Sequence, residues 1–180
     1  MIKLIDILKE QVQTKYEYGC VMLYFDFPTI DKIHGVINDE DIFQDPDDPS
    51  FGLETEPHTT LLYGLHDGVT KQNIKNILDK FTFDAFKISN ASLFEHENFD
   101  VLKFDVVGDG LYEANAELVK YPNTQTYPDY HPHLTIAYLK PGKGKQYVKE
   151  LNGLEFELTP KYAVYSMPSG DKIKISINIK

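Results

Sequence analysis

The sequence contains no arginine. All 18 basic residues are lysines, 28 aspartates and glutamates outnumber them, and the formal net charge is −10. Arginine binds phosphate through two parallel hydrogen bonds, and a protein that holds long nucleic acid normally presents a basic face. The composition therefore argues against a long nucleic acid as partner. A small nucleotide is easier to accommodate, because histidine, hydroxyl, lysine or backbone N–H groups can bind its few charges.

Cysteine and long apolar runs are also scarce. The single cysteine, Cys20, excludes an internal disulfide, and its apolar neighbours predict a buried strand thiol in a protein from a reducing compartment. Charged residues interrupt the segment MIKLIDILKEQV (1–12), which predicts a short amphipathic helix and not a secretory signal. No stretch is long enough to cross a bilayer, so we expect a soluble cytoplasmic protein without a membrane partner.

Glycine-rich phosphate loops, cysteine/histidine zinc sets and low-complexity tracts are absent from the sequence. Hydrophobic residues make up 42% of the 180 positions, which is enough for the core of one globular domain covering 1–180. The acidity is uneven, because NDEDIFQDPDDP (38–49) holds six carboxylates. We interpret residues 38–50 as an acidic, solubilising loop inserted into the domain.

Strand and helix patterns alternate along the chain, which predicts an α+β fold. The expected strands cover 20–27, 58–65, 84–94, 101–107, 133–140, 161–166 and 172–180, and the expected helices cover 29–37, 69–81, 111–120 and 142–151. Thr70 is a candidate N-cap for the second helix. In the last strand, isoleucines at every second position from 173 to 179 predict one buried and one solvated face, and MPSGD before it predicts a hairpin turn.

One seven-residue frame occurs twice. EPHTTLLYGL (56–65) and HPHLTIAYLK (131–140) share the pattern Pro-His-x-Thr-aliphatic-x-Tyr. Each half of the chain carries one copy together with strand and helix patterns, which predicts internal pseudo-symmetry. Strict alternation along a strand puts Tyr63 and Tyr138, the tyrosines of the two copies, on the face opposite to the histidines and threonines. We therefore expect both tyrosines in the core.

The polar half of the frame carries the chemistry. In a strand, residues i and i+2 share a face, so His58 projects with Thr60 and His133 with Thr135. If the two strands lie side by side, one imidazole can act as base and the other as acid in a phosphodiester reaction, while the hydroxyls donate to the non-bridging oxygens. The frame lacks the carboxylates that would complete a metal shell, so we expect no metal and no other cofactor. These four residues are our predicted catalytic residues.

The segments His58-Thr59-Thr60 and His133-Leu134-Thr135 resemble the signature of the 2H phosphoesterase superfamily, roughly over residues 18–180. The resemblance implies a bilobal, pseudo-twofold α+β fold with antiparallel sheets around a central cleft and helices on the outside. It also implies metal-independent chemistry on 2′,3′-cyclic phosphates, or on 2′-5′ or 3′-5′ linkages of small nucleotides and RNA ends. The acidic loop 38–50 departs from the compact family pattern and could partly screen the cleft.

Within the superfamily, ETEPHTTLLYGL (54–65) is most similar to a phage branch that includes an anti-CBASS nuclease. The resemblance implies a phosphodiesterase that cleaves 3′-5′ linkages of cyclic di- and trinucleotide second messengers and so counters bacterial CBASS immunity in the host cytoplasm. RNA-end processing, as a 2′,3′-cyclic phosphodiesterase or a 2′-5′ RNA ligase-like enzyme, is the enzymatic alternative. A protein that sequesters nucleotides without cleaving them, or an acidic mimic of nucleic acid, is the non-enzymatic one. The oligomeric state and the preferred base are left open.

Three further residues are candidate substrate contacts. Tyr24 on the first strand and Tyr130 in the loop before the second frame could stack on bases, and Lys140 at the end of the second frame could meet a phosphate. Each has a simpler interpretation, as core, loop-packing or solvated residue respectively. The histidines outside the two frames, His34, His66, His96 and His131, are interpreted as surface or loop residues, as are Tyr121 and Tyr127.

Overall fold

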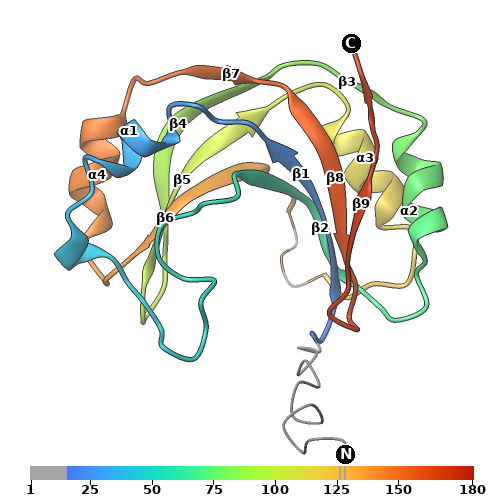
Figure 1. Ribbon diagram of the computed structural model, residues 1–180, viewed down its shortest axis with the longest axis horizontal. Coiled ribbons are helices and arrows are strands. Elements are labelled where there is room, and N and C mark those ends of the chain that lie inside the picture. The colour runs from blue at the N-terminus through green and yellow to red at the C-terminus, as the bar shows by residue number, and fades with distance from the viewer. Residues whose placement is uncertain (1–15, 126, 128) are drawn as a thin grey trace, which may run out of the picture.

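The computed structural model describes residues 16–125, 127 and 129–180 (Figure 1). The helix expected over residues 1–12 lies outside these ranges. In chain order the elements are β1 (Gly19–Phe25), α1 (Ile30–His34), the 3-10 helix η1 (Asp39–Asp41), β2 (His58–Leu65), α2 (Lys71–Leu78), β3 (Thr82–Phe83), β4 (Phe86–Glu95), β5 (Asp100–Val107), α3 (Leu111–Leu118), β6 (His133–Leu139), α4 (Gly144–Leu151), β7 (Phe156–Leu158), β8 (Pro160–Ser166), β9 (Lys172–Ile175) and β10 (Asn178–Ile179).

One curled, antiparallel sheet organises the protein. Its eight strands follow the order β7-β4-β5-β6-β2-β1-β8-β9, and every neighbouring pair is antiparallel. The strands that carry the repeated frame, β2 and β6, lie at the centre, with three strands beyond each of them. Only Thr59 and Leu134 pair across this central junction. The sequence predicted an α+β fold with antiparallel sheets, and the structure confirms the class while joining the two halves into one sheet.

The helices lie on the outside of the curve (Figure 1). Helix α3 contacts β2 and α2, while α1 contacts β6 and α4 contacts β4 and β5. The main core fills the space between sheet and helices and includes Leu61, Leu102, Leu134 and Ile136, all fully buried. The opposite face of the sheet, which we call the inner face, is free of helices in the described part of the chain. Within that part, no helix combines the length and the apolar character needed to span a membrane.

Local sequence explains where the helices begin. Thr70 caps α2 as predicted, because its hydroxyl accepts from the Asn73 backbone N–H and the Asn73 side chain accepts from the Thr70 N–H in return. At the start of α4 the buried Asp100 carboxylate accepts from the backbone N–H groups of Gly142 and Gly144. A Cβ at Gly144 would lie 2.5 Å from the end of the Leu93 side chain, which would have to shift, so glycine allows the close approach of helix and sheet there.

A β-bulge occurs at the same point of both frames. Along β2, Leu62 pairs with Val21 and Thr60 with Met22, so Leu61 is the extra residue. Along β6, Ala137 pairs with Leu102 and Thr135 with Lys103, so Ile136 is the extra residue. The bulge carbonyls accept from side chains: Asn115 Nδ2 donates to Leu61 O over 2.7 Å, and His34 Nε2 to Ile136 O over 3.1 Å. His34 is therefore half-buried with a structural partner, and our interpretation of it as a surface residue was wrong.

The bulges reverse the alternation of side chains along both motif strands. Tyr63 pairs with Cys20, which shares a face of β1 with Met22, the partner of Thr60. Tyr138 pairs with Val101, which shares a face of β5 with Lys103, the partner of Thr135. Both tyrosines therefore lie on the inner face. Tyr63 is 47% exposed and Tyr138 is half-buried outside the main core. The prediction that they are core residues was wrong, because it assumed uninterrupted alternation.

The acidic insertion lies against the free edge of β6. Bridges join Ile42 to Leu139 and Leu53 to Ala137, and Lys140 N–H donates to Asp41 O. The insertion therefore continues the sheet where β2 and β6 diverge. One of its carboxylates is structural: buried Asp41 accepts from the Tyr147 hydroxyl over 2.7 Å.

The C-terminal segment is only partly the predicted strand. The hairpin of β8 and β9 is confirmed, and its turn is closed by the Met167 N–H donating to Asp171 O. β9 ends at Ile175, however, and residues 178–179 form β10, which pairs in parallel with β3 in a second, small sheet. Ile179 is 44% exposed, so the buried face predicted for the isoleucines does not extend to the end.

Candidate active site

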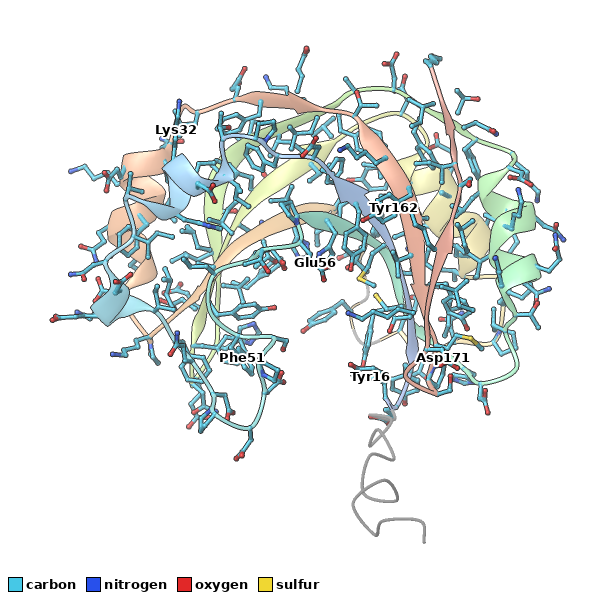
Figure 2. The ribbon with its side chains drawn as sticks, viewed as in Figure 1. Tyr16, Lys32, Phe51, Glu56, Tyr162 and Asp171 are labelled. Carbon is cyan, nitrogen blue, oxygen red and sulfur yellow. The ribbon has the colours of Figure 1, made fainter. Side chains whose placement is uncertain are left out.

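The two His-x-Thr pairs meet on the inner face of the sheet. The pair formed by Thr59 and Leu134 sets an antiparallel register in which His58 lies across from Thr135, and Thr60 across from His133. Each motif residue also has a partner on its other side: Tyr24 for His58, Met22 for Thr60, Lys103 for Thr135 and Asp105 for His133. Figure 2 shows Glu56, two positions before His58, on the inner side of the curve. The four predicted catalytic residues are thus neighbours.

Both motif histidines are held in the same way. His58 Nδ1 lies 2.8 Å from Glu56 O, and His133 Nδ1 lies 2.8 Å from His131 O. A carbonyl oxygen can only accept, so in each ring Nδ1 carries the donated proton and Nε2 is the nitrogen left for proton exchange. The two rings share this geometry because the Pro-His sequence is repeated. In each copy the ring contacts the backbone carbonyl of the residue two positions before the histidine.

The surroundings of His58 are aromatic and acidic. Tyr24 stacks on the His58 ring with centroids 5.3 Å apart, and Tyr162 stacks on Tyr24 at 5.5 Å. Lys174 Nζ lies 3.6 Å from the centroid of the Tyr162 ring, a cation–π contact at the end of this stack. Glu54 Oε2 is 3.7 Å from His58 Nδ1. An imidazolium at His58 would therefore form an ion pair with Glu54.

The surroundings of His133 are apolar and carry charges of both signs, Lys103 and Asp105. The edge of the Phe94 ring packs on His133 with centroids 5.0 Å apart. Burial is the main cause that lowers the pKa of His133, and the positive charges of Lys103 and of a protonated His58 lower it further, while the hydrogen bond to His131 O and the Asp105 carboxylate raise it. An imidazolium at His133 would therefore lose hydration. The two histidines have matching geometry and different electrostatic surroundings.

Lys103 is the buried cation of the site. It is 6% exposed, its Nζ donates to Ser92 Oγ over 2.9 Å and to Asp105 Oδ1 over 3.0 Å, and it lies 4.5 Å from the centroid of Phe94. The pseudo-equivalent position on β1 is Met22, the partner of Thr60. The two threonines therefore differ in their outer strand partner, which is apolar for Thr60 and a cation for Thr135.

The motif threonines differ in their surroundings. Thr135 is 9% exposed and Thr60 is half-buried. Thr60 shares a hydrogen bond with Cys20, whose pKa is raised to about 12 by burial, a rise that this hydrogen bond opposes. The Cys20 thiol is consequently protonated at neutral pH and a poor nucleophile. The Tyr130 hydroxyl donates to Thr60 O over 3.0 Å and so holds the backbone of the first motif.

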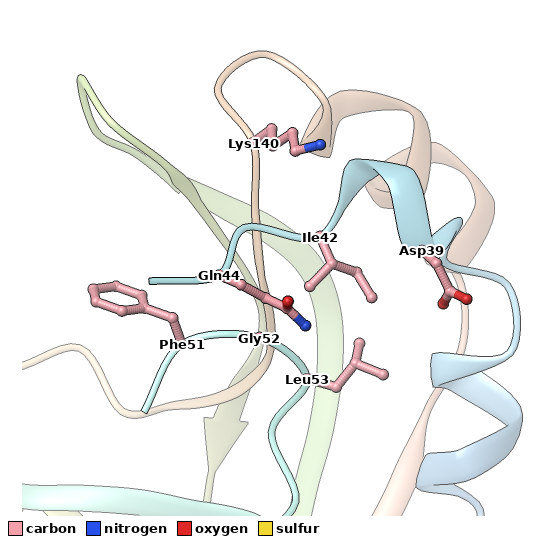
Figure 3. A pocket seen from close by; sticks show the side chains of 7 residues that line it. All are labelled: Asp39, Ile42, Gln44, Phe51, Gly52, Leu53 and Lys140. Carbon is pink, nitrogen blue, oxygen red and sulfur yellow. The ribbon is translucent and has the colours of Figure 1, made fainter. Parts of the chain in front are cut away.

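The three predicted substrate contacts lie in different places. Tyr24 is on the inner face, 7% exposed and against His58. Tyr130 packs on the main core and on Tyr112 of α3, with its hydroxyl engaged by Thr60 O. Lys140 donates to Glu40 O over 2.6 Å and lines a pocket of about 710 Å³ with residues of the acidic insertion (Figure 3). That pocket includes none of the motif residues, so the structure does not bring Lys140 to them.

Sequence reasoning missed Glu54, Phe94 and Lys103. The segment VLKFDVV (101–107) contained a usable signal for Lys103, because a lysine and an aspartate two residues apart in an otherwise apolar strand must share a face. Glu54 and Phe94 gave no signal, since the register of distant strands positions them. Among the described residues no group of three histidine, cysteine, aspartate or glutamate side chains could hold a metal ion.

Comparison with known proteins supports the fold. No family model and no curated protein matches this sequence. Among solved structures, Usb1 of Kluyveromyces marxianus, solved with uridine monophosphate, is similar with a TM-score of 0.56 and 10% identity over 89% of this chain and 98% of that chain. A structure described as a phosphoesterase matches with a TM-score of 0.48 and 12% identity, over 89% of this chain and 96% of that chain. At such identities the likeness to Usb1 shows a shared fold.

Proposed function

We propose that the protein is a metal-independent phosphodiesterase of the 2H phosphoesterase type, in which His58 and His133 exchange protons with the substrate. The observation that carries the proposal is the arrangement of the two His-x-Thr pairs on one face of adjacent strands, with each Nδ1 bonded to a backbone carbonyl. Two such imidazoles are what a two-proton phosphodiester reaction requires, and each positioned acid or base contributes about 10²–10⁴-fold.

The electrostatic difference between the histidines assigns their roles in the proposal. His133 is the base, because burial and Lys103 lower its pKa and so favour the neutral ring, which can accept a proton. His58 is the acid, because Glu54 would pair with its protonated ring. The sequence alone left these roles open, since the two frames are symmetrical.

Cleavage of a 3′-5′ linkage then proceeds as an internal transfer. His133 Nε2 takes the proton of the ribose 2′-OH, the 2′-oxygen bonds to the adjacent phosphorus, and the bond from phosphorus to the 5′-oxygen breaks. His58 gives its Nε2 proton to the departing 5′-oxygen. The products are a 5′-hydroxyl and a 2′,3′-cyclic phosphate, while the Thr60 and Thr135 hydroxyls donate to the non-bridging oxygens, where charge develops.

For the substrate we propose cyclic di- and trinucleotide second messengers, with a role in countering bacterial CBASS immunity. The net charge of −10, the absence of arginine and the similarity of residues 54–65 to the phage branch support a small nucleotide. RNA-end phosphodiesterase activity is the second candidate. The observation in its favour is the fold shared with Usb1, whose structure contains uridine monophosphate.

A substrate panel separates these functions. Purified protein is incubated with cyclic dinucleotides, cyclic trinucleotides, 2′,3′-cyclic mononucleotides and a short RNA, all with a chelator present, and the products are identified by mass spectrometry. Linear products with 2′,3′-cyclic phosphate ends from the cyclic oligonucleotides support the first candidate. Exclusive turnover of the mononucleotides or of RNA ends supports the second. Tight binding without any cleavage would contradict the enzymatic proposal.

A further inference from the structure

We infer that Tyr63 and Tyr138 form two nucleobase-binding subsites, one at each end of the catalytic cluster, so that the site takes a phosphodiester with a base on both sides. This inference rests on the proposed function and deepens it, because it names the minimal substrate as a dinucleotide unit. It derives from the two bulges, which bring both tyrosines onto the face that carries the histidines.

The first subsite is built on β2. Tyr63 is 47% exposed, an unusual exposure for an aromatic ring in a central strand. Its ring meets Tyr18 edge-on at 5.9 Å, and Tyr18 stacks in turn on His66 at 5.9 Å. The His66 ring is held by Thr124 Oγ1 at 2.8 Å. A chain of contacts thus fixes a partly exposed ring beside the site.

The second subsite is built on β6. Tyr138 is half-buried and meets the rings of Phe51 and Phe99 edge-on at 5.0 and 5.7 Å. Phe51 directly follows the acidic insertion and packs on Phe43 within it at 5.0 Å. These rings stand apart from the main core, so Phe43 and Phe51 supply an aromatic wall beside the second motif. This gives the acidic insertion a role that a solubilising loop lacks.

The antiparallel arrangement puts the two subsites at opposite ends. Each tyrosine lies beyond the threonine of its own motif, about 7 Å further along the strand by the rise per residue once the bulge is discounted. Because β2 and β6 run in opposite directions, these displacements point away from each other. Figure 2 shows Phe51 and Tyr16 on opposite limbs of the curved sheet, with Glu56 above and between them. A phosphate between the histidines would have one tyrosine on each side.

Two aromatic rings that flank a phosphate site suit the chemistry of a dinucleotide. Base stacking on an aromatic side chain tolerates any base, which fits a site with no arginine to read base edges. The phosphodiester is then positioned from both sides, and the reacting 2′-oxygen is held near the phosphorus. A mononucleotide 2′,3′-cyclic phosphate fills one subsite alone and is bound less tightly.

The test measures binding apart from turnover. Tyr63→Leu and Tyr138→Leu remove the rings and keep apolar volume, and each is placed in a His58→Ala/His133→Ala background so that no substrate is cleaved. The dissociation constant of 3′,3′-cyclic di-AMP is measured by calorimetry. Each substitution is expected to weaken binding about 5- to 100-fold, the range that corresponds to loss of one base–aromatic stack. Tyr63→Phe and Tyr138→Phe keep the ring and should keep the affinity.

Leu154→Ala is the control for the loss of an exposed apolar side chain, because Leu154 is 40% exposed and follows α4 outside the inner face. Unchanged affinity in both leucine variants, or an equal loss in the Leu154 control, would overturn the inference whatever the enzyme cleaves. Should Tyr138→Leu disturb the folding of its cluster, the exposed Tyr63 carries the test alone. Absence of cleavage by the wild-type protein would instead count against the proposed function and leave the binding result standing.

Discussion

Thr59 and Leu134 face each other at the junction of β2 and β6, and among the described residues they are the one strand pair recorded between these two central strands. They occupy the same place in their frames, between the histidine and the threonine. Both are fully buried, yet the Thr59 hydroxyl has no hydrogen-bond partner in the described structure, whereas Leu134 is apolar. The junction that aligns the four motif residues thus contains an unsatisfied polar atom.

Thr59→Val should stabilise the protein. Valine has the shape of threonine without the hydroxyl, and an unsatisfied buried hydroxyl costs about 1–3 kcal/mol. We expect the free energy of unfolding in urea to rise by about 1 kcal/mol, with turnover unchanged. Thr60→Val is the adjacent control, because Thr60 is on the inner face: it should lose turnover instead of gaining stability. A less stable Thr59→Val variant would show that the hydroxyl is satisfied in solution.

Lys103→Met should move the acidic limb of the pH profile. In the proposed mechanism His133 is the base and is active when neutral, so activity should fall as the pH drops through its pKa, which burial and Lys103 lower from the ordinary value. Removing the cation raises that pKa, and the acidic limb of kcat/KM should shift to higher pH. Met22→Leu, at the pseudo-equivalent position, should leave the limb in place. A shift to lower pH after Lys103→Met would exclude His133 as the base.

Tyr24→Leu should reduce turnover more than substrate binding. Tyr24 stacks on the His58 ring and is 7% exposed, so we expect it to orient His58, the acid of the proposed mechanism, and to contribute little contact with substrate. We expect kcat to fall about tenfold with KM nearly constant, since a displaced acid loses part of its 10²–10⁴-fold contribution. Tyr24→Phe keeps the stack and should retain activity. An increase in KM alone would return Tyr24 to the role of a substrate contact.

Asp41→Asn should destabilise the fold at neutral pH and not at low pH. The Tyr147 hydroxyl, Lys143 and Gln146 hold the pKa of Asp41 below its ordinary value. A depressed pKa in the folded state contributes stability above the unfolded value, and this contribution is lost as the pH falls through the folded value. Thermal unfolding of both proteins should therefore show a lower midpoint for the variant at pH 7 and converging midpoints in acid. A constant difference at every pH would contradict the assignment.

Local patterns predicted the elements that local forces determine. β2 has the predicted bounds. α2 begins after Thr70, and both its capping box and its apolar periodicity involve residues that are close together in the sequence. The pairing of β10 with β3 was not predictable in this way, since it joins residues 178–179 to 82–83. The bulges at Leu61 and Ile136 were missed because an extra residue becomes visible only against a partner strand.

In the candidate site, too, only the part that a local sequence pattern encodes was predictable. His58, Thr60, His133 and Thr135 could be chosen from sequence because their frame repeats. The surroundings that distinguish the two histidines, Glu54 on one side and Lys103 with Phe94 on the other, depend on strands that are distant in the chain. The repeated frame was therefore predictable from the sequence, while the difference in surroundings on which the proposed acid and base roles rest was not.

The central claim is that two imidazoles on one face of β2 and β6 both transfer protons. It is tested most directly by the turnover of His58→Ala and His133→Ala on a cyclic dinucleotide in the presence of a chelator, with folding checked by thermal unfolding. The account predicts that each folded variant loses at least about 10²-fold in kcat. Wild-type turnover by either folded variant would contradict it.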